Sequence, residues 1–265
     1  MPYLNVDEVE SALVGLSAAF PGQCELIALP NDSIEGRSIH AVRLADGPLD
    51  VRPAMLFIGC QHAREWGSAD ICVSFAADLL EAYDTGSGLT YGGTSFTAGQ
   101  VQQILEETQV FVLPCVNPDG RHFSQNTEAM WRKNRNMAEF DGDPQTVGVD
   151  LNRNYDFLWD FPNLFSPLAL GSLVVSTDPG NDTYHGSAPH SEPEVQNVVW
   201  LLDTYPQIRW LIDVHSFSQL LYFQWGDDEN QITEPSQNFQ NPAHDDDRGI
   251  APAVTVHHPE SLALG

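Results

Sequence analysis

Residues 54–66 read AMLFIGCQHAREW, and the interpretation of the whole chain starts from them. An apolar run, residues 54–59, is followed almost at once by a polar cluster, residues 61–66. A short, continuous apolar run predicts a strand that is buried on both faces of a sheet. Polar residues directly after such a strand indicate a functional site, because sites in open α/β sheets form beyond the carboxyl ends of the strands.

The same pattern recurs along the chain. Three further apolar runs predict buried strands at residues 109–116, 208–214 and 220–225. Helical periodicity occurs in three other segments, at residues 6–20, 68–83 (with Ser68 as a candidate cap) and 192–205. Strands that alternate with helices predict an α/β domain with a mostly parallel sheet.

The composition excludes several classes of protein. Of 265 residues, 42% are hydrophobic and 10% aromatic, which is enough for a core and argues against wholesale disorder. Eleven basic against 37 acidic residues give a net charge of −26, which argues against nucleic acid and anionic membranes as partners. No apolar run is long enough for a transmembrane helix. The four cysteines form no C-x-x-C pair, so we expect buried free thiols.

The two ends of the chain lead to two expectations. Residues 1–10 lack the basic start and apolar run of a signal peptide, so we expect a cytoplasmic protein, or a secreted or periplasmic one if the true N-terminus lies upstream. Residues 231–265 contain four prolines and an acidic run but no periodicity. We therefore predict one incomplete domain over residues 1–230, followed by an irregular tail that a frameshift, premature stop or partial gene would explain.

Three polar clusters follow three of the predicted strands, at residues 61–66, 117–120 and 215–218, and are expected to meet at one edge of the sheet. His62 and Glu65 are three residues apart, so both can point at one ion, and His215 is a candidate third ligand. Two histidines and one glutamate form a catalytic type of zinc site with a position left open for water. Asp150 is a candidate acceptor for a proton of a ligand histidine.

Each of these residues also has a simpler explanation when it is taken alone. The H-x-x-E spacing of His62 and Glu65 also occurs in surface pairs at helix ends. A histidine that follows a strand, such as His215, can be an ordinary satisfied polar residue. The zinc hypothesis therefore depends on the combination of the clusters.

Seven short motifs strengthen that combination: HAREW at 62–66, NPDG at 117–120, WRKNR at 131–135, GVDLNRN at 148–154, YHG at 184–186, SEPE at 191–194 and HSFSQ at 215–219. In this order, over residues 3–230, the sequence resembles the zinc carboxypeptidases of the carboxypeptidase A/B family (peptidase family M14). The resemblance implies a three-layer α/β/α fold with a mixed, mostly parallel central sheet, here without the family's last strand and helix.

The resemblance also implies a function. It is that of a zinc metallocarboxypeptidase, which cleaves the C-terminal residue from a peptide or protein with zinc-activated water. By this resemblance, His62, Glu65 and His215 bind zinc, one ion per chain, and Asp150 supports a ligand histidine. The resemblance also implies that Arg135 stabilises the oxyanion. Asn152 and Arg153 would bind the substrate carboxylate, with Arg64 beside the cleft. A planar guanidinium suits both tasks, since it binds carboxylates bidentately and stabilises a developing oxyanion. The NPDG motif is expected to form a turn, and Ser191 with Glu194 a capping box.

One expected part of the machinery is missing. The family's general base is a glutamate on a later strand, and only 265 − 215 = 50 residues follow His215. The candidates Glu229, Glu234 and Glu260 lack the surrounding pattern, and the last tyrosine, Tyr222, lies on an apolar run. We therefore find no general base, and we expect the strands at 208–214 and 220–225 to have exposed edges.

Two alternatives remain open. Without the base, the chain would be an inactive module that binds zinc and a peptide carboxylate. The second alternative is a metal-dependent amidase that acts on cell-wall peptides or acylated amino acids. Asn152 and Arg153 favour instead a substrate with a terminal carboxylate.

Overall fold

The computed structural model describes residues 3–47, 51–164, 170 and 173–222. The chain divides into two units, one of residues 1–155 with 176–217 and one of residues 156–175 with 218–265. The short helix α5 (Phe161–Leu164) belongs to the second unit, and the other described elements belong to the first. The boundary expected at residue 230 and the tail that follows it lie outside the described residues, so this division stays a prediction.

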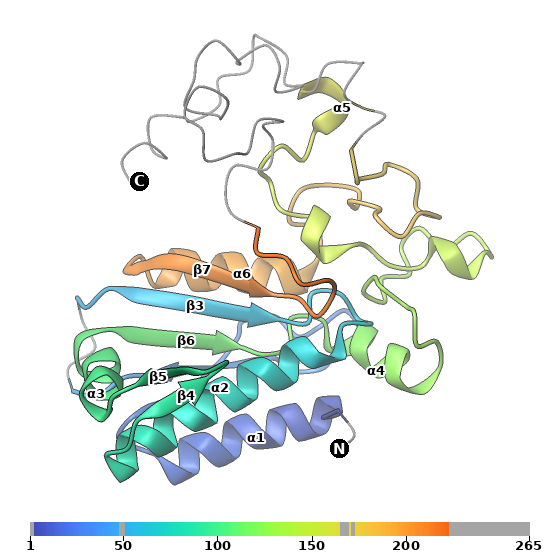
Figure 1. The fold of residues 1–265 in the computed structure, drawn as a ribbon. Coiled ribbons are helices and arrows are strands. Elements are labelled where there is room, and N and C mark those ends of the chain that lie inside the picture. The colour runs from blue at the N-terminus through green and yellow to red at the C-terminus, as the bar shows by residue number, and fades with distance from the viewer. Residues whose placement is uncertain (1–2, 48–50, 165–169, 171–172, 223–265) are drawn as a thin grey trace. The chain divides into compact units, whose positions relative to one another are not determined.

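A five-stranded sheet of order β1-β2-β6-β3-β7 forms the centre of the first unit (Figure 1). Its strands are β1 (Cys24–Ala28), β2 (His40–Leu44), β3 (Ala54–Gly59), β6 (Gln109–Leu113) and β7 (Ile208–Val214). β2 is antiparallel to both of its neighbours, while β3 is parallel to β6 and to β7. Four strands therefore point the same way, and the prediction of a mixed, mostly parallel sheet is confirmed. A separate hairpin consists of β4 (Leu89–Tyr91) and β5 (Thr94–Phe96).

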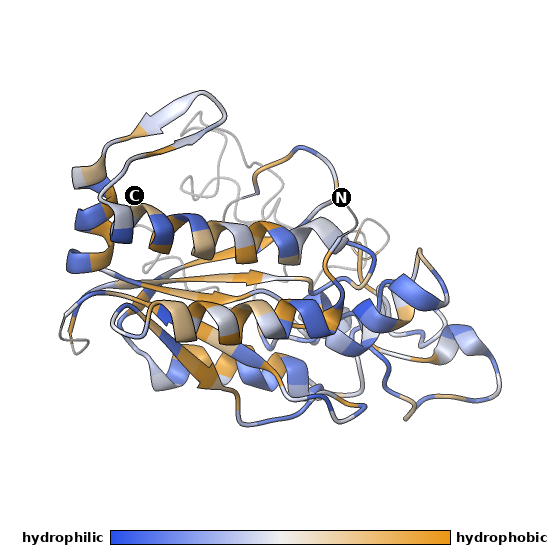
Figure 2. Ribbon diagram, turned by 90° about the horizontal axis from the view of Figure 1, so that it is seen from below, coloured by the Kyte–Doolittle hydropathy of each residue, from blue (hydrophilic) through white to orange (hydrophobic). Residues whose placement is uncertain are grey.

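Helices cover both faces of this sheet, and β6 shows why. Val110 and Val112 pack in one core cluster with α1 (Val6–Ala19), α2 (Trp66–Thr85) and α3 (Ala98–Glu107). Phe111 and Leu113 point the other way and pack in a second cluster with α6 (Pro193–Thr204). Apolar residues accordingly predominate along the central strands (Figure 2). The predicted three-layer α/β/α architecture is confirmed.

Two other sequence expectations concern membranes and cysteines. None of the described helices combines the length and apolarity that crossing a bilayer requires. The four cysteines are free and buried, as predicted.

The strand β7 differs from its prediction as a strand buried on both faces. Trp210, Leu211 and Ile212 are 55%, 43% and 40% exposed. Within the described part of the chain, β7 pairs only with β3 and is the last strand of the sheet, so no neighbour covers these side chains there. Residues 220–222 form no strand, which corrects the described part of the run predicted at 220–225.

Three helix starts also differ from expectation. Asn117 does not form a simple turn but caps α4 (Pro118–Asn126), with its side chain accepting a hydrogen bond from the Gly120 N–H. Glu65, not Ser68, is the residue that precedes α2. The capping box expected of Ser191 is absent, because its hydroxyl donates to the Glu192 carboxylate instead.

The end of β3 shows how the sheet leads into the polar cluster. A Cβ at Gly59 would lie 2.9 Å from the carbonyl oxygen of Pro114 and 3.0 Å from that of Ser68, so only glycine fits between these backbones. Cys60 follows with φ of 56°, a left-handed conformation that is unusual for a residue with a side chain. This turn directs the chain away from the sheet immediately before His62.

Buried Glu194 gives the fold a testable pH dependence. Its Oε1 accepts from the Ile34 N–H at 3.1 Å and its Oε2 from Asn134 Nδ2 at 3.2 Å. Burial, with the nearby Glu192 charge, raises its pKa from 4.5 to about 7. The contribution of Glu194 to the free energy of unfolding is therefore fully present below pH 4.5 and is lost as the pH rises through 7, a decrease of about 3 kcal/mol.

The variant Glu194→Gln should not show this decrease, because glutamine does not titrate. Relative to the wild type, we expect its free energy of unfolding to rise by about 3 kcal/mol between pH 4.5 and pH 8, measured by urea unfolding. Parallel pH profiles of the two proteins would contradict this.

Candidate metal centre

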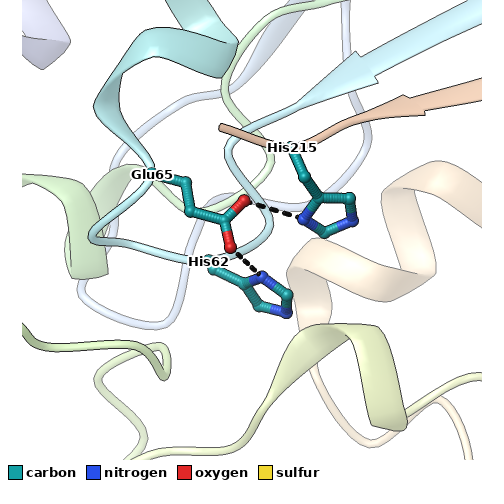
Figure 3. Close-up of side chains that lie close together, drawn as sticks. All are labelled: His62, Glu65 and His215. Atoms are coloured by element: carbon teal, nitrogen blue, oxygen red, sulfur yellow. Dashed lines mark hydrogen bonds and ion pairs between the residues drawn. The ribbon is translucent and has the colours of Figure 1, made fainter. Parts of the chain in front are cut away.

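Three polar side chains from two distant parts of the sequence meet beyond the ends of β3 and β7. His62 lies in the turn after β3, Glu65 directly precedes α2, and His215 follows β7. The two strands are parallel neighbours, and their last paired residues are Gly59 and Val214. The pairing therefore brings residues 150 positions apart to one place, as the strand-end prediction expects (Figure 3).

The Glu65 carboxylate lies between the two imidazole rings. His62 Nδ1 is 2.7 Å from Oε1, and His215 Nδ1 is 2.8 Å from Oε2. Ligand atoms of the three residues all lie within 4.8 Å of one another. His62 and Glu65 are buried and His215 is half-buried. Two imidazole nitrogens and one carboxylate therefore converge from three sides on a small volume.

The electrostatics of this cluster favour its charged forms. Burial alone would raise the pKa of Glu65, but hydrogen bonds with His215 and His62 lower it well below its usual range. Burial alone would lower the pKa of His215, but hydrogen bonds with Asp213 and Glu65 raise it to about 10. The two ring nitrogens of His215 thus each contact a carboxylate, Nδ1 that of Glu65 and Nε2 that of Asp213.

Asp150 lies on the opposite side of the His62 ring. Its Oδ1 is 3.3 Å from His62 Nε2, and its Oδ2 accepts two hydrogen bonds from Arg132, at 2.9 and 2.7 Å. Burial alone would raise the pKa of this fully buried carboxyl, but His62 and Arg132 lower it. Asp150 is therefore an anion directed at the outer nitrogen of His62.

The donor set fits a divalent metal ion. His62 Nε2 is buried, and within the described residues it makes no hydrogen bond of good geometry, although Asp150 lies beside it. A metal ion on Nδ1 leaves the single proton of a neutral imidazole on Nε2, where the Asp150 carboxylate can accept it. Two imidazoles and one carboxylate are the ligands of catalytic zinc sites, so His62, Glu65 and His215 would hold the ion.

The sequence profile of the zinc carboxypeptidase family matches residues 9–258. The chain belongs to this family. The matched range also includes residues 231–258, which follow the boundary expected at residue 230.

The relatives of this family member include carboxypeptidases A1 and A2. Carboxypeptidase A2 of Rattus norvegicus is 31% identical over 241 residues, which are 89% of this chain and 51% of the relative. Carboxypeptidase A1 of Homo sapiens is 31% identical over 224 residues, covering 84% of this chain and 47% of the relative. The chain thus spans about half the length of these relatives.

Solved structures of other proteins share the fold. Thrombin-activatable fibrinolysis inhibitor is 27% identical, with a TM-score of 0.65, over 82% of this chain and 48% of that one. The bovine form of the same protein, in complex with a tick carboxypeptidase inhibitor, is 24% identical, with a TM-score of 0.66, over 88% of this chain and 67% of that one.

In this member of the zinc carboxypeptidase family, the arginine expected to stabilise the oxyanion contacts two aromatic rings. The guanidinium carbon of Arg135 lies 3.8 Å from the ring centre of Phe123 and 4.7 Å from that of Trp131. The Nε of Arg135 lies 3.8 Å from Oε1 of Glu35. Within the described residues, the Arg135 guanidinium therefore contacts two aromatic rings and Glu35. The oxyanion role of Arg135 stays a prediction, and Arg132 is the arginine that contacts Asp150 beside His62.

The residues expected to bind the substrate carboxylate lie partly at the centre. Asn152 Nδ2 is 3.3 Å from His215 Nε2. Arg153 is close to Asp150, it donates from Nη1 to the Asn152 carbonyl at 2.7 Å, and burial lowers its pKa. Arg64, in contrast, donates to Asp182 at 3.2 Å and to the Met130 carbonyl at 3.0 Å. Asn152 and Arg153 are thus beside the centre, whereas Arg64 is held by the loop of Asp182.

Three residues of the centre were missed in the sequence. Arg132 lies in the same motif as Arg135, and its sequence position gives no sign of which arginine faces inward. Asp213 binds the outer nitrogen of His215, at 2.7 Å. It could have been found, because residues two apart on a strand share a face. Gln61 donates to Asp213 at 2.6 Å, and no sequence signal indicates this contact.

Proposed function

We propose that the protein is a zinc metallocarboxypeptidase, which hydrolyses the C-terminal peptide bond of peptides or proteins. The observation that carries this proposal is the arrangement of His62, Glu65 and His215, with both Nδ1 atoms directed at one carboxylate. Membership of the zinc carboxypeptidase family supports the same reading. Because the chain spans about half of its relatives, their activity is a proposal for this chain.

A zinc ion bound by the three ligands would polarise the scissile carbonyl and acidify a bound water molecule. Asp150 holds His62 in the tautomer that presents Nδ1. Arg132, fixed by its two hydrogen bonds to Asp150, places a positive charge at the centre, where an oxyanion develops. We assign to Arg132 the role that the sequence had suggested for Arg135.

The expected substrate group is a free carboxylate. Arg153 and Asn152 supply a half-buried guanidinium and an amide next to the centre. A guanidinium fork matches the geometry of a carboxylate, which selects the last residue of a peptide over internal positions. This placement favours a carboxypeptidase over an amidase that acts on substrates without a terminal carboxylate. The expected cytoplasmic location stays a prediction.

One observation favours a second candidate function, an inactive module that binds zinc and a peptide carboxylate. Within the described residues, the carboxylates that contact the two imidazoles are Glu65, Asp150 and Asp213, and each is engaged with a ring nitrogen. None is therefore set aside as a general base in that part of the chain. The glutamates considered for this role, Glu229, Glu234 and Glu260, lie outside the described residues.

A turnover assay separates the two candidates. The purified chain, loaded with one equivalent of Zn²⁺, is incubated with peptides of varied C-terminal residues, and released amino acids are quantified by mass spectrometry. We expect release from free-acid peptides and none from matched C-terminal amides, because the amide lacks the charge that Arg153 would bind. Absence of release from every peptide by the zinc-loaded chain would overturn the peptidase proposal. Peptide binding that is lost in Arg153→Ala would then establish the binding module.

A further inference from the structure

Asp213 binds the outer nitrogen of the third ligand. Its Oδ2 lies 2.7 Å from His215 Nε2. The two residues are two positions apart at the end of β7, so their side chains point to the same face of the strand. Asp213 therefore lies at Nε2 of His215, just as Asp150 lies at Nε2 of His62. The difference is that Asp213 belongs to the strand that leads to its histidine, whereas Asp150 belongs to a separate segment.

Gln61 holds the Asp213 carboxylate in place. Its Nε2 donates to the same oxygen, Oδ2, at 2.6 Å, and its Oε1 accepts from the Tyr155 hydroxyl at 3.0 Å. Gln61 is only 2% exposed. With both ends of its amide engaged, the side chain has one orientation, and the donor faces Asp213.

The position of Gln61 gives this contact a particular consequence. Gln61 directly precedes His62, and the last backbone pair between β3 and β7 is Gly59 with Val214. The Gln61–Asp213 hydrogen bond thus continues the connection between the two strands beyond that pair. It ties the turn that carries one histidine to the strand end that carries the other.

A carboxylate on the outer nitrogen of an imidazole fixes both the ring orientation and the tautomer. Asn152 Nδ2 also lies near His215 Nε2, but at 3.3 Å, compared with 2.7 Å for Asp213. The other oxygen of Asp213, Oδ1, is buried and makes no hydrogen bond within the described residues. The hydrogen bonding of Asp213 is therefore concentrated on the oxygen that faces His215 and Gln61.

We propose that Asp213 is a positioning residue of the metal centre, and that Gln61 acts through it. Asp213 keeps the proton of His215 on Nε2 and directs Nδ1 at the site of the ion, while Gln61 and Tyr155 fix the Asp213 carboxylate. This inference rests on the proposed zinc site but not on turnover. Outer-shell partners of this kind change metal affinity by about 10- to 100-fold.

The test measures Zn²⁺ affinity by competition with a chromophoric chelator. We expect Asp213→Ala to weaken Zn²⁺ binding about 10- to 100-fold, and Gln61→Met, which removes the donor at similar volume, to weaken it by a smaller factor. Adding Gln61→Met to Asp213→Ala should cause no further loss, because Gln61 acts through the missing carboxylate. Two independent, multiplying losses would contradict that coupling.

Two controls separate positioning from general damage. Asp182→Asn, on a surface loop, should bind Zn²⁺ like the wild type. The absorption spectrum of bound Co²⁺ should change in Asp213→Asn, since the ring orientation at the ion changes, while near-UV circular dichroism confirms the fold. If the Zn²⁺ affinities of both Asp213→Ala and Asp213→Asn stayed within about twofold of the wild type, the proposal would be overturned. A wild type that binds one Zn²⁺ without turnover would overturn only the peptidase proposal.

Discussion

Replacing Glu65 with alanine should remove high-affinity zinc binding. Glu65 supplies the carboxylate between His62 Nδ1 and His215 Nδ1, at 2.7 and 2.8 Å. Without Glu65, one of the three ligands is missing and no anion remains between the two imidazoles. We therefore expect the Zn²⁺ affinity to fall about 1000-fold or more, a larger loss than the removal of a residue that contacts only a ligand would cause. The measurement is chelator competition at fixed pH, with the zinc content after gel filtration as a second readout.

The same variant should lose its stabilisation by zinc. Zinc that binds only the native state at 1000 times its Kd stabilises the fold by about 4 kcal/mol, which is visible as a rise in Tm on adding zinc. We expect no such rise for Glu65→Ala. Glu81→Ala, an exposed site on α2, is the matched control and should retain the full rise. If Glu65→Ala kept a Zn²⁺ affinity within about tenfold of the wild type, the ion would be bound somewhere else.

The sequence predicted the parts of the fold that depend on local pattern. The apolar runs at β3 and β6 indicated strands buried on both faces, and β6 is buried at all five positions. The same reasoning was wrong for the faces of β7, where Trp210, Leu211 and Ile212 are exposed. The exposed edge expected at 208–214 agrees with the described part, in which β7 pairs only with β3. Helix α3 was missed, although Thr97 and Gln100 form a capping box that the sequence contains.

For the candidate centre, the sequence identified the residues that lie after strands and failed for those that depend on side-chain direction. His62, Glu65 and His215 follow strand ends, and the parallel pairing of β3 and β7 brings them together. Arg132 and Arg135 are three residues apart in one motif. The two differ in their contacts, since Arg135 stacks on Phe123 and Trp131 while Arg132 donates to Asp150. That stacking is a tertiary contact, and no periodicity in the sequence encodes it.

This difference between the two arginines leads to the second large effect. Arg132 donates twice to Asp150, which faces His62, so its charge lies at the proposed centre. We expect Arg132→Ala to lower kcat/KM by about 100- to 1000-fold, as loss of an oxyanion-stabilising group does. Arg132→Lys should recover part of this, because it keeps the charge but loses the planar fork. The measurement is steady-state hydrolysis of a free-acid peptide by the zinc-loaded chain.

Arg135→Ala is the matched control, since it removes the same group from a position three residues away. It should keep a kcat/KM close to that of the wild type and lose about 1 kcal/mol of stability, because the cation–π contacts with Phe123 and Trp131 are lost. The same ranking should hold for binding of a phosphonate peptide that imitates the tetrahedral intermediate, so the test also applies to a chain without turnover. If Arg135→Ala lost activity or phosphonate affinity while Arg132→Ala kept both, the oxyanion role would return to Arg135, and its stacked side chain would have to swing toward His62 when substrate binds.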